Sequence, residues 1–285
     1  MGDMNTKTKT HQQKKWLSIA EAADLIQDGQ TIAFGGMTLY RRPVAFVRQL
    51  LRRPQRPIDL TLLCFTAGYE SDLLVGSGCV RAVRSVYFGL ESFGLAPMFT
   101  EAAQKGQIEI IEETEASLVM GLRAASSGVG FMPSRAWIGT DLPRLRLDVK
   151  TVTDPYSGET LMAFPAIDCD VVVLHGLEAD QYGDVKLNNN LGIDMELVYV
   201  AKTVIVTVER VVEKVERSVE AAILPAPGAD YIVHAPQGAW PTSCYPDYPI
   251  GGGELLRYVD ACNSGDFQTY LAEFTADRRS DLSGR

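Results

Sequence analysis

Short apolar runs rich in β-branched residues alternate along this chain with longer segments of helical periodicity. The alternation predicts an α/β protein with a single open, largely parallel sheet flanked by helices. The runs that predict strands are TIAFGG at 31–36, DLTLLCF at 59–65, AVRSVYFG at 82–89, IEIIEE at 108–113, DVVVLHG at 170–176, TVIVTVE at 203–209 and YIVHAP at 231–236.

The first two helices have recognisable starts. Ser18 and Glu21 form a capping box, and Asp28-Gly29 predicts the end of that helix. Pro43 suits the first position of a second helix, which continues through VAFVRQLLRR. The apolar faces consist of Ala22, Leu25 and Ile26 in the first helix, and of Val44, Val47, Leu50 and Leu51 in the second.

One domain accounts for most of the chain. Residues 1–14 are polar and basic and predict a disordered leader, residues 15–274 form the domain, and residues 275–285 form a polar tail. Residues 143–159 are a candidate connection between two lobes.

Composition and charge narrow the range of partners and sites that the chain is expected to have. The chain has 285 residues, of which 46% are hydrophobic and 22% charged, as expected of a soluble globular protein. Its net charge of -9 argues against a nucleic-acid partner, and the leader has no apolar run that would form a signal peptide or membrane anchor. The five cysteines are scattered without a C-x-x-C pair, so we expect reduced thiols in the cytoplasm and no metal site. Small molecules or proteins are the expected partners.

The segment DGQTIAFGGMTLYRRP at 28–43 carries candidate chemistry. Gly35-Gly36 ends a predicted strand, and in open α/β sheets the ligand crevice lies beyond the carboxyl ends of the strands. The free N–H groups of the next helix, with Arg41 and Arg42, predict a site for a carboxylate or phosphate. A tight turn followed by two solvated arginines is the alternative. The predicted substrate-binding residues are Gly35, Gly36, Met37, Thr38, Arg41, Arg42 and, from a later motif, Arg135.

Four motifs in order resemble those of the α subunits of family I CoA-transferases, the glutaconate type above all. They are DGQTIAFGGMTLYRRP, SSGVGFMPSRAWIGTD, HGLEADQYGDV and APQGAWPTSCYPDY, and the resemblance covers roughly residues 15 to 260. Met37 replaces the signature Phe of the first motif. Arg41 stands where many members have Gly, and arginine there favours the glutaconate type over the short-chain 3-oxoacid type.

The resemblance implies acyl exchange through a glutamyl-CoA thioester, with CoA esters as substrates and no permanently bound cofactor. The nucleophilic glutamate of the family belongs to a glutamate-glycine motif of the β subunit, and no Glu-Asn-Gly occurs in this chain. The chain is therefore expected to need a β subunit of related fold, in a heterodimer or α2β2 assembly, with the active site at the interface. A dicarboxylate such as glutaconate, or a 3-oxoacid, is the expected acceptor class.

Glu115 offers a second interpretation. It follows a predicted strand and begins a helix. The resemblance extends to relatives that hydrolyse or decarboxylate CoA esters, among them ring-cleaving hydrolases of steroid breakdown in which a glutamate at this place does the chemistry. Arg135 could then orient Glu115 or hold a substrate carboxylate. The alternative is a first-turn acid favoured by the helix dipole and a structural ion pair.

The remaining polar residues of interest are expected to have structural roles. His175 is expected to be a buried turn histidine, Glu209 a structural carboxylate and Cys244 an unreactive thiol, so no triad or metal cluster is predicted. A standalone hydrolase and a non-catalytic binding module stay open as other function classes.

Overall fold

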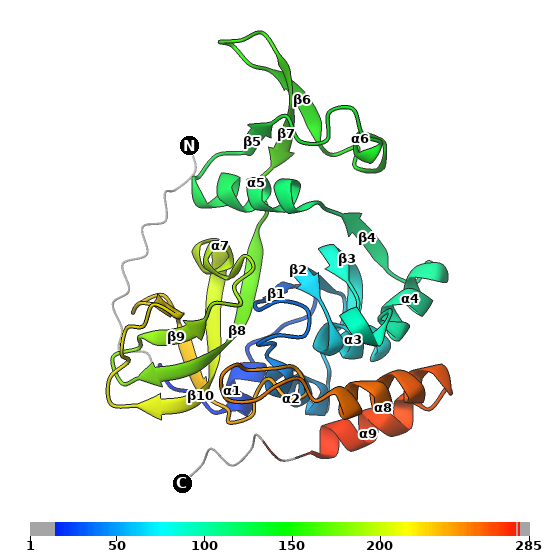
Figure 1. The fold of residues 1–285 in the computed structure, drawn as a ribbon. Coiled ribbons are helices and arrows are strands. Elements are labelled where there is room, and N and C mark those ends of the chain that lie inside the picture. The colour runs from blue at the N-terminus through cyan, green and yellow to red at the C-terminus, as the bar shows by residue number, and fades with distance from the viewer. Residues whose placement is uncertain (1–14, 278, 280–285) are drawn as a thin grey trace.

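The computed structural model describes residues 15–277 and residue 279. Its main body is a nine-stranded sheet with helices on both faces (Figure 1). The strands are β1 (Thr31–Phe34), β2 (Leu60–Ala67), β3 (Val80–Phe88), β4 (Glu109–Glu112), β5 (Phe131–Ser134), β6 (Lys150–Thr153), β7 (Thr160–Pro165), β8 (Cys169–Asp180), β9 (Val185–Asn188), β10 (Ala201–Val212), β11 (Ala221–Leu224) and β12 (Tyr231–His234). The helices are α1 (Ile19–Ala23), α2 (Val44–Arg52), α3 (Tyr69–Gly76), α4 (Pro97–Gln104), α5 (Glu115–Ser126), α6 (Leu142–Leu145), α7 (Asp194–Val200), α8 (Gly252–Asn263) and α9 (Phe267–Ala276), with a 3-10 turn η1 (Glu91–Phe93).

The parallel part of the sheet consists of the strands that the apolar runs predict. Parallel pairing joins β12, β10, β8, β1, β2, β3 and β4 in that order. The antiparallel strands β9 and β11 continue the sheet beside the far end of β8. The predicted fold class is confirmed.

Side-chain alternation along the strands divides the core between two layers of helices. In β1, Ile32 and Phe34 face the core that α1, α2, α3, α8 and α9 complete, whereas Ala33 faces the opposite core. Leu118 and Leu122 of α5 and Leu197 of α7 cover that second face. A strand buried on both faces explains the continuous apolar runs in the sequence.

The predicted helix starts are also correct. Ser18 Oγ accepts the Glu21 N–H at 3.2 Å, and a Glu21 carboxylate oxygen accepts the Ser18 N–H at 2.7 Å. Helix α1 ends at Ala23, earlier than predicted. In α2, which follows Pro43, the expected apolar face is buried. Helix α9 continues to Ala276, so its last two residues lie in the stretch assigned to the tail.

A second, antiparallel sheet of three strands, in the order β5-β7-β6, stands beyond α5 and away from the main body (Figure 1). Its strand β6 lies within 143–159, so that stretch forms part of the small sheet and is not a connection between lobes. Residues 1–14, which we interpret as a leader, lie outside the described residues. Among the helices that the structure describes, none is long and apolar enough to cross a membrane.

Candidate functional site

Three loops meet at the carboxyl edge of the parallel strands. The glycine loop after β1 is bonded to the segment after β12, because Arg41 N donates to Ser243 O at 2.6 Å and Ser243 N donates to Leu39 O at 2.9 Å. The loop between β9 and α7 joins them through Asp194, whose Oδ1 accepts the Gly36 N–H at 3.1 Å. This edge is where open α/β sheets bind ligands.

Backbone strain is concentrated in the same loops. Of the six described non-glycine residues with positive φ, three lie here: Thr38 at 36°, Arg41 at 57° and Gln237 at 53°. Such conformations persist where surrounding structure holds them, and they cluster at functional sites. We therefore place the candidate site at these loops.

The two glycines of the loop are required by packing within the chain. A methyl group on Gly35 would overlap the side chains of Leu174 and Asp194. At Gly36, where φ is +77°, it would overlap the carbonyl oxygens of Tyr40 and Arg41. Close packing by the protein itself explains both glycines, without a ligand approaching them.

Arg41 is fully buried and its guanidinium is bonded on every side. Nη2 contacts Asp194 Oδ1 at 2.8 Å and Asn190 O at 3.1 Å, Nη1 donates to His175 O at 2.5 Å, and Nε donates to Asn188 Oδ1 at 3.1 Å. Burial alone would raise the pKa of Asp194, but the charge of Arg41 and the hydrogen bonds outweigh it and hold that pKa below its usual range. The pair is thus ionised and self-contained.

Arg42 is equally buried and is held by Glu70. Its Nε and Nη2 donate to Glu70 Oε1 at 2.9 and 2.6 Å, and its Nη1 donates to Gly36 O at 3.2 Å. The prediction that Arg41 and Arg42 hold an anionic substrate group is therefore wrong for direct contact, as is the alternative of two solvated arginines. Each neutralises a buried carboxylate and fixes the glycine loop from beneath.

The outer rim of the loops faces solvent. Met37 and Tyr40 are half-buried and Gln237 is exposed, whereas Thr38 is buried. The Thr38 N–H donates to Thr66 Oγ1 at 2.7 Å. Among the predicted substrate-binding residues of this loop, Met37 has the most accessible side chain.

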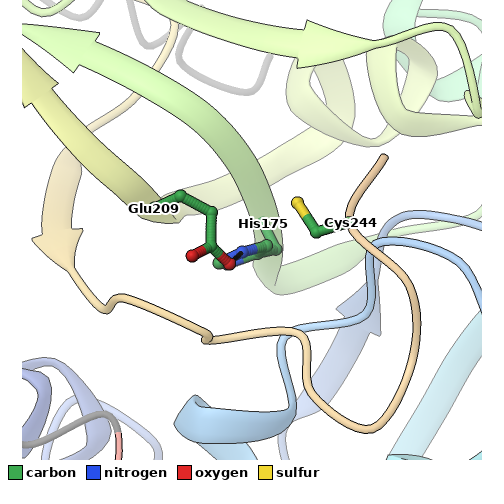
Figure 2. Close-up of side chains that lie close together, drawn as sticks. All are labelled: His175, Glu209 and Cys244. Carbon is green, nitrogen blue, oxygen red and sulfur yellow. Dashed lines mark hydrogen bonds and ion pairs between the residues drawn. The ribbon is translucent and has the colours of Figure 1, made fainter. Parts of the chain in front are cut away.

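His175, near the middle of β8, lies against Glu209 of β10 (Figure 2). Its Nε2 is 2.7 Å from Glu209 Oε1, and its Nδ1 is 2.8 Å from Thr207 Oγ1. The side chain is fully buried. The prediction that His175 is buried is confirmed. The prediction that it lies in a turn is wrong, because β8 continues through it to Asp180.

Glu209 organises the segment that follows β12. It accepts the N–H groups of Gln237 at 2.6 Å and Gly238 at 3.1 Å, and the Tyr248 hydroxyl at 2.5 Å. Burial favours the neutral acid, but the hydrogen bond and charge of His175 and the other donors hold the pKa of Glu209 below its usual range. The strained backbone at Gln237 is fixed by this carboxylate.

Cys244 completes a cluster that sequence reasoning missed. Ligand-type atoms of His175, Glu209 and Cys244 all lie within 4.8 Å of one another (Figure 2). The geometry does not fit a metal centre, because Glu209 already accepts four donors and burial, with the nearby charge of Glu209, raises the pKa of the Cys244 thiol. The residues are 34 and 35 positions apart in sequence, so no local motif announces them.

Glu115 is the first residue of α5 and is exposed. Thr114 caps the helix together with Ser117, and the Glu115 carboxylate has no hydrogen bond or ion pair among the described residues. Its neighbour Glu113 is buried instead, with Oε1 at 2.7 Å from Arg146 Nη1. Of the three nearby glutamates, Glu113 is the structural one and Glu115 is available to a ligand.

Arg135 does not orient Glu115. It follows β5 in the small sheet, is 74% exposed and pairs with Glu159. Arg135 therefore forms an ion pair, as the alternative interpretation predicted, and the prediction that it positions Glu115 is wrong in this chain.

Comparison with known proteins agrees with the fold. The family model for Coenzyme A transferase matches residues 16–235. The chain belongs to the coenzyme A transferase family.

Relatives within the family have different activities. The chain is 33% identical to a subunit of the 3-oxoadipate CoA-transferase of Pseudomonas knackmussii, over 81% of this chain and 83% of the relative. It is also 33% identical to the cholesterol ring-cleaving hydrolase IpdA subunit of Rhodococcus jostii, over 94% of each chain. The solved glutaconate coenzyme A-transferase of Acidaminococcus fermentans superposes with a TM-score of 0.84 at 27% identity, over 94% of this chain and 90% of that one. The chain is thus similar to both transferase and hydrolase subunits.

Sequence reasoning found the glycine loop and predicted Glu209 as a structural carboxylate, but it did not find Glu70 and Asp194. Glu70, Asp194 and Glu209 come from α3, α7 and β10, far apart along the chain. The one available signal was that two adjacent arginines before an apolar helix require anions if they are buried.

Proposed function

We propose that this chain is the α subunit of a two-subunit CoA-transferase, which moves CoA between an acyl-CoA and a carboxylic acid. The observation that carries the proposal is that the acids and thiols under the glycine loop are sequestered. Asp194, Glu70 and Glu209 are buried and bonded, and the Cys64 and Cys244 thiols are buried with raised pKa values. We infer that the covalent nucleophile at this edge comes from another chain.

The chemistry then divides between the two chains. A glutamate of the β subunit first attacks the thioester carbonyl and CoA leaves as a thiolate, giving a mixed anhydride. The thiolate attacks the glutamyl carbonyl of the anhydride, which releases the donor acid and leaves a glutamyl-CoA thioester; the acceptor acid reverses both steps. This chain contributes a rigid wall, with Met37, Tyr40 and Gln237 at its accessible rim.

The proposal includes the acceptor class and the compartment. A dicarboxylate such as glutaconate, or a 3-oxoacid, suits the named relatives. The five cysteines are free, which supports a reducing compartment such as the cytoplasm. CoA esters are substrates in this scheme.

Glu115 supports a second candidate, in which the chain is part of a hydrolase or decarboxylase that acts on a CoA ester. Its carboxylate is exposed and unpaired among the described residues, so a substrate proton could come within hydrogen-bond reach of it. The hydrolase IpdA subunit matches this chain along 94% of both lengths, which favours keeping this candidate.

The experiment compares the isolated chain with the chain co-expressed with a CoA-transferase β subunit from the same organism. We expect acyl exchange only from the pair, and E115Q to retain activity within about threefold. E112Q is the matched control, because Glu112 is an exposed acid on the preceding strand. Loss of turnover by about a hundredfold or more in E115Q, but not in E112Q, would establish the second candidate, since that is the contribution of a general base. Transfer by the isolated chain would refute the two-subunit proposal.

A further inference from the structure

The small sheet has one covered face and one open face. On the covered face, Met162 and Phe164 of β7 pack with Trp137 and Val149, and all four are at most 6% exposed. The Trp137 and Phe164 rings meet edge to face with centroids 5.0 Å apart. This miniature core holds the three strands rigidly.

Among the described residues, the opposite face is apolar and partly exposed: Phe131 and Pro133 are exposed, and Leu161 and Ala163 are half-buried. Alternate residues of a strand point to opposite faces, and directly paired residues of antiparallel strands share a face. The pairs Phe131 with Pro165, Pro133 with Ala163 and Val152 with Leu161 therefore lie opposite the Met162–Phe164 side. Phe131 is 43% exposed. Lys150, paired with Ala163, is the one charged residue among these paired positions.

Exposed apolar side chains are concentrated in this part of the chain. Of the sixteen large exposed hydrophobic residues in the described part, six fall within residues 129–156, which are about a tenth of the sequence. Those six are Val129, Phe131, Ile138, Leu145, Leu147 and Tyr156. Apolar surface gathered in this way is typical of a protein–protein interface.

We propose that the open face of the β5-β7-β6 sheet is a docking surface for the β subunit, an inference that rests on the proposed function. The occupant is a separate chain because the relatives are named as subunits and because this chain's buried acids leave the nucleophile to a partner. Trp137 Nε1 donates to Thr114 Oγ1 at 2.9 Å, and Arg146 donates to Glu112 O at 2.7 Å. These bonds tie Trp137 and Arg146 to the start of α5 and to the end of β4.

The open face of the small sheet is too small to form a stable interface alone, so we expect it to be the centre of a larger contact with the β subunit. Three strands about 4.8 Å apart and up to six residues long cover about 300 Å², whereas a stable interface takes about 800 Å² from each partner. The remainder has to come from surface outside the three strands.

The test uses the full chain co-expressed with the β subunit, with dissociation constants from sedimentation velocity. F131D puts a charge in the centre of the face, and we expect the dissociation constant to rise at least tenfold. L256D is the matched control, because Leu256 of α8 is 52% exposed outside the small sheet; it should leave the constant unchanged. Both isolated variants should unfold like the wild type, since both side chains are exposed.

Hydrogen–deuterium exchange on the wild-type complex gives an independent readout. Amides of β5, β6 and β7 should exchange more slowly in the complex than in the free chain. Unchanged exchange there, or a F131D complex as tight as wild type and fully active, overturns the docking surface while leaving the proposed function intact. A F131D effect confined to self-association of the isolated chain assigns the face to a second copy and also overturns it. Failure of the wild-type chain to bind the β subunit would remove the proposed function as well.

Discussion

Replacing Arg41 with methionine should destabilise the chain far more than it changes substrate binding. The side chains of Arg41 and Asp194 are both 0% exposed, so solvent does not screen the pair. Removing one partner of a buried ion pair costs about 3–5 kcal/mol, because the other charge stays buried. Asp194 would keep only backbone donors, from Gly36 and Gly192.

The free energy of unfolding is measured by urea denaturation of the isolated chain. R41M should lose about 3–5 kcal/mol, and R41M/D194N should lose less than the sum of the two single variants by about 1–3 kcal/mol, because the pair is coupled. R135M is the matched control, since Arg135 pairs with Glu159 at the surface, and its unfolding curve should overlay that of the wild type.

The opposite pattern would refute this reasoning. If R41M unfolds like the wild type and the assembled enzyme shows only a raised KM for an anionic substrate, Arg41 contacts substrate and the buried pair does not describe its role.

Two other changes test the structure. Burial, opposed by hydrogen bonds from Tyr258 and the Phe99 and Met98 amides, raises the pKa of Asp72 to about 6 from 3.8. The stabilising contribution of Asp72 is therefore present at low pH and is lost as the pH rises through about 6. The free energy of unfolding of the wild type relative to D72N, from urea denaturation, should fall by roughly 1.5 kcal/mol between pH 5 and pH 8, and a pH-independent difference would contradict the assignment. G35A should lower the melting temperature strongly because the added methyl overlaps Leu174 and Asp194. The melting temperature of G253A, a change at an open helical position, should match or slightly exceed that of the wild type. Equal melting temperatures for both variants would show that the loop tolerates the methyl group.

The parallel sheet could be read from the sequence because its strands are buried on both faces. Runs such as VVVL at 171–174 and VIVTV at 204–208 are continuous in β-branched or apolar residues. The strands that escaped prediction are half-exposed or irregular. FMPS in β5 contains a proline, and KTVT in β6 is mostly polar. Their pairing is set by tertiary contacts around Trp137 rather than by local pattern.

The candidate site was predicted in position but not in mechanism. The glycine loop was placed correctly because strand ends share one edge of a parallel sheet. The fate of Arg41 and Arg42 depended on carboxylates 28 and 153 residues away, Glu70 and Asp194. Sequence spacing does not reveal pairs so far apart along the chain. The two arginines were therefore predicted to bind a ligand, whereas the structure shows them in buried ion pairs.

Mass spectrometry of the β subunit, trapped during turnover of the assembled enzyme, tests the central claim most directly. Only the transferase route builds a glutamyl-CoA thioester on the partner chain. With hydroxylamine or borohydride present, the account predicts one modified glutamate on the β subunit, formed equally well by the wild-type and E115Q enzymes. No adduct on the β subunit, together with loss of turnover in E115Q, would contradict it.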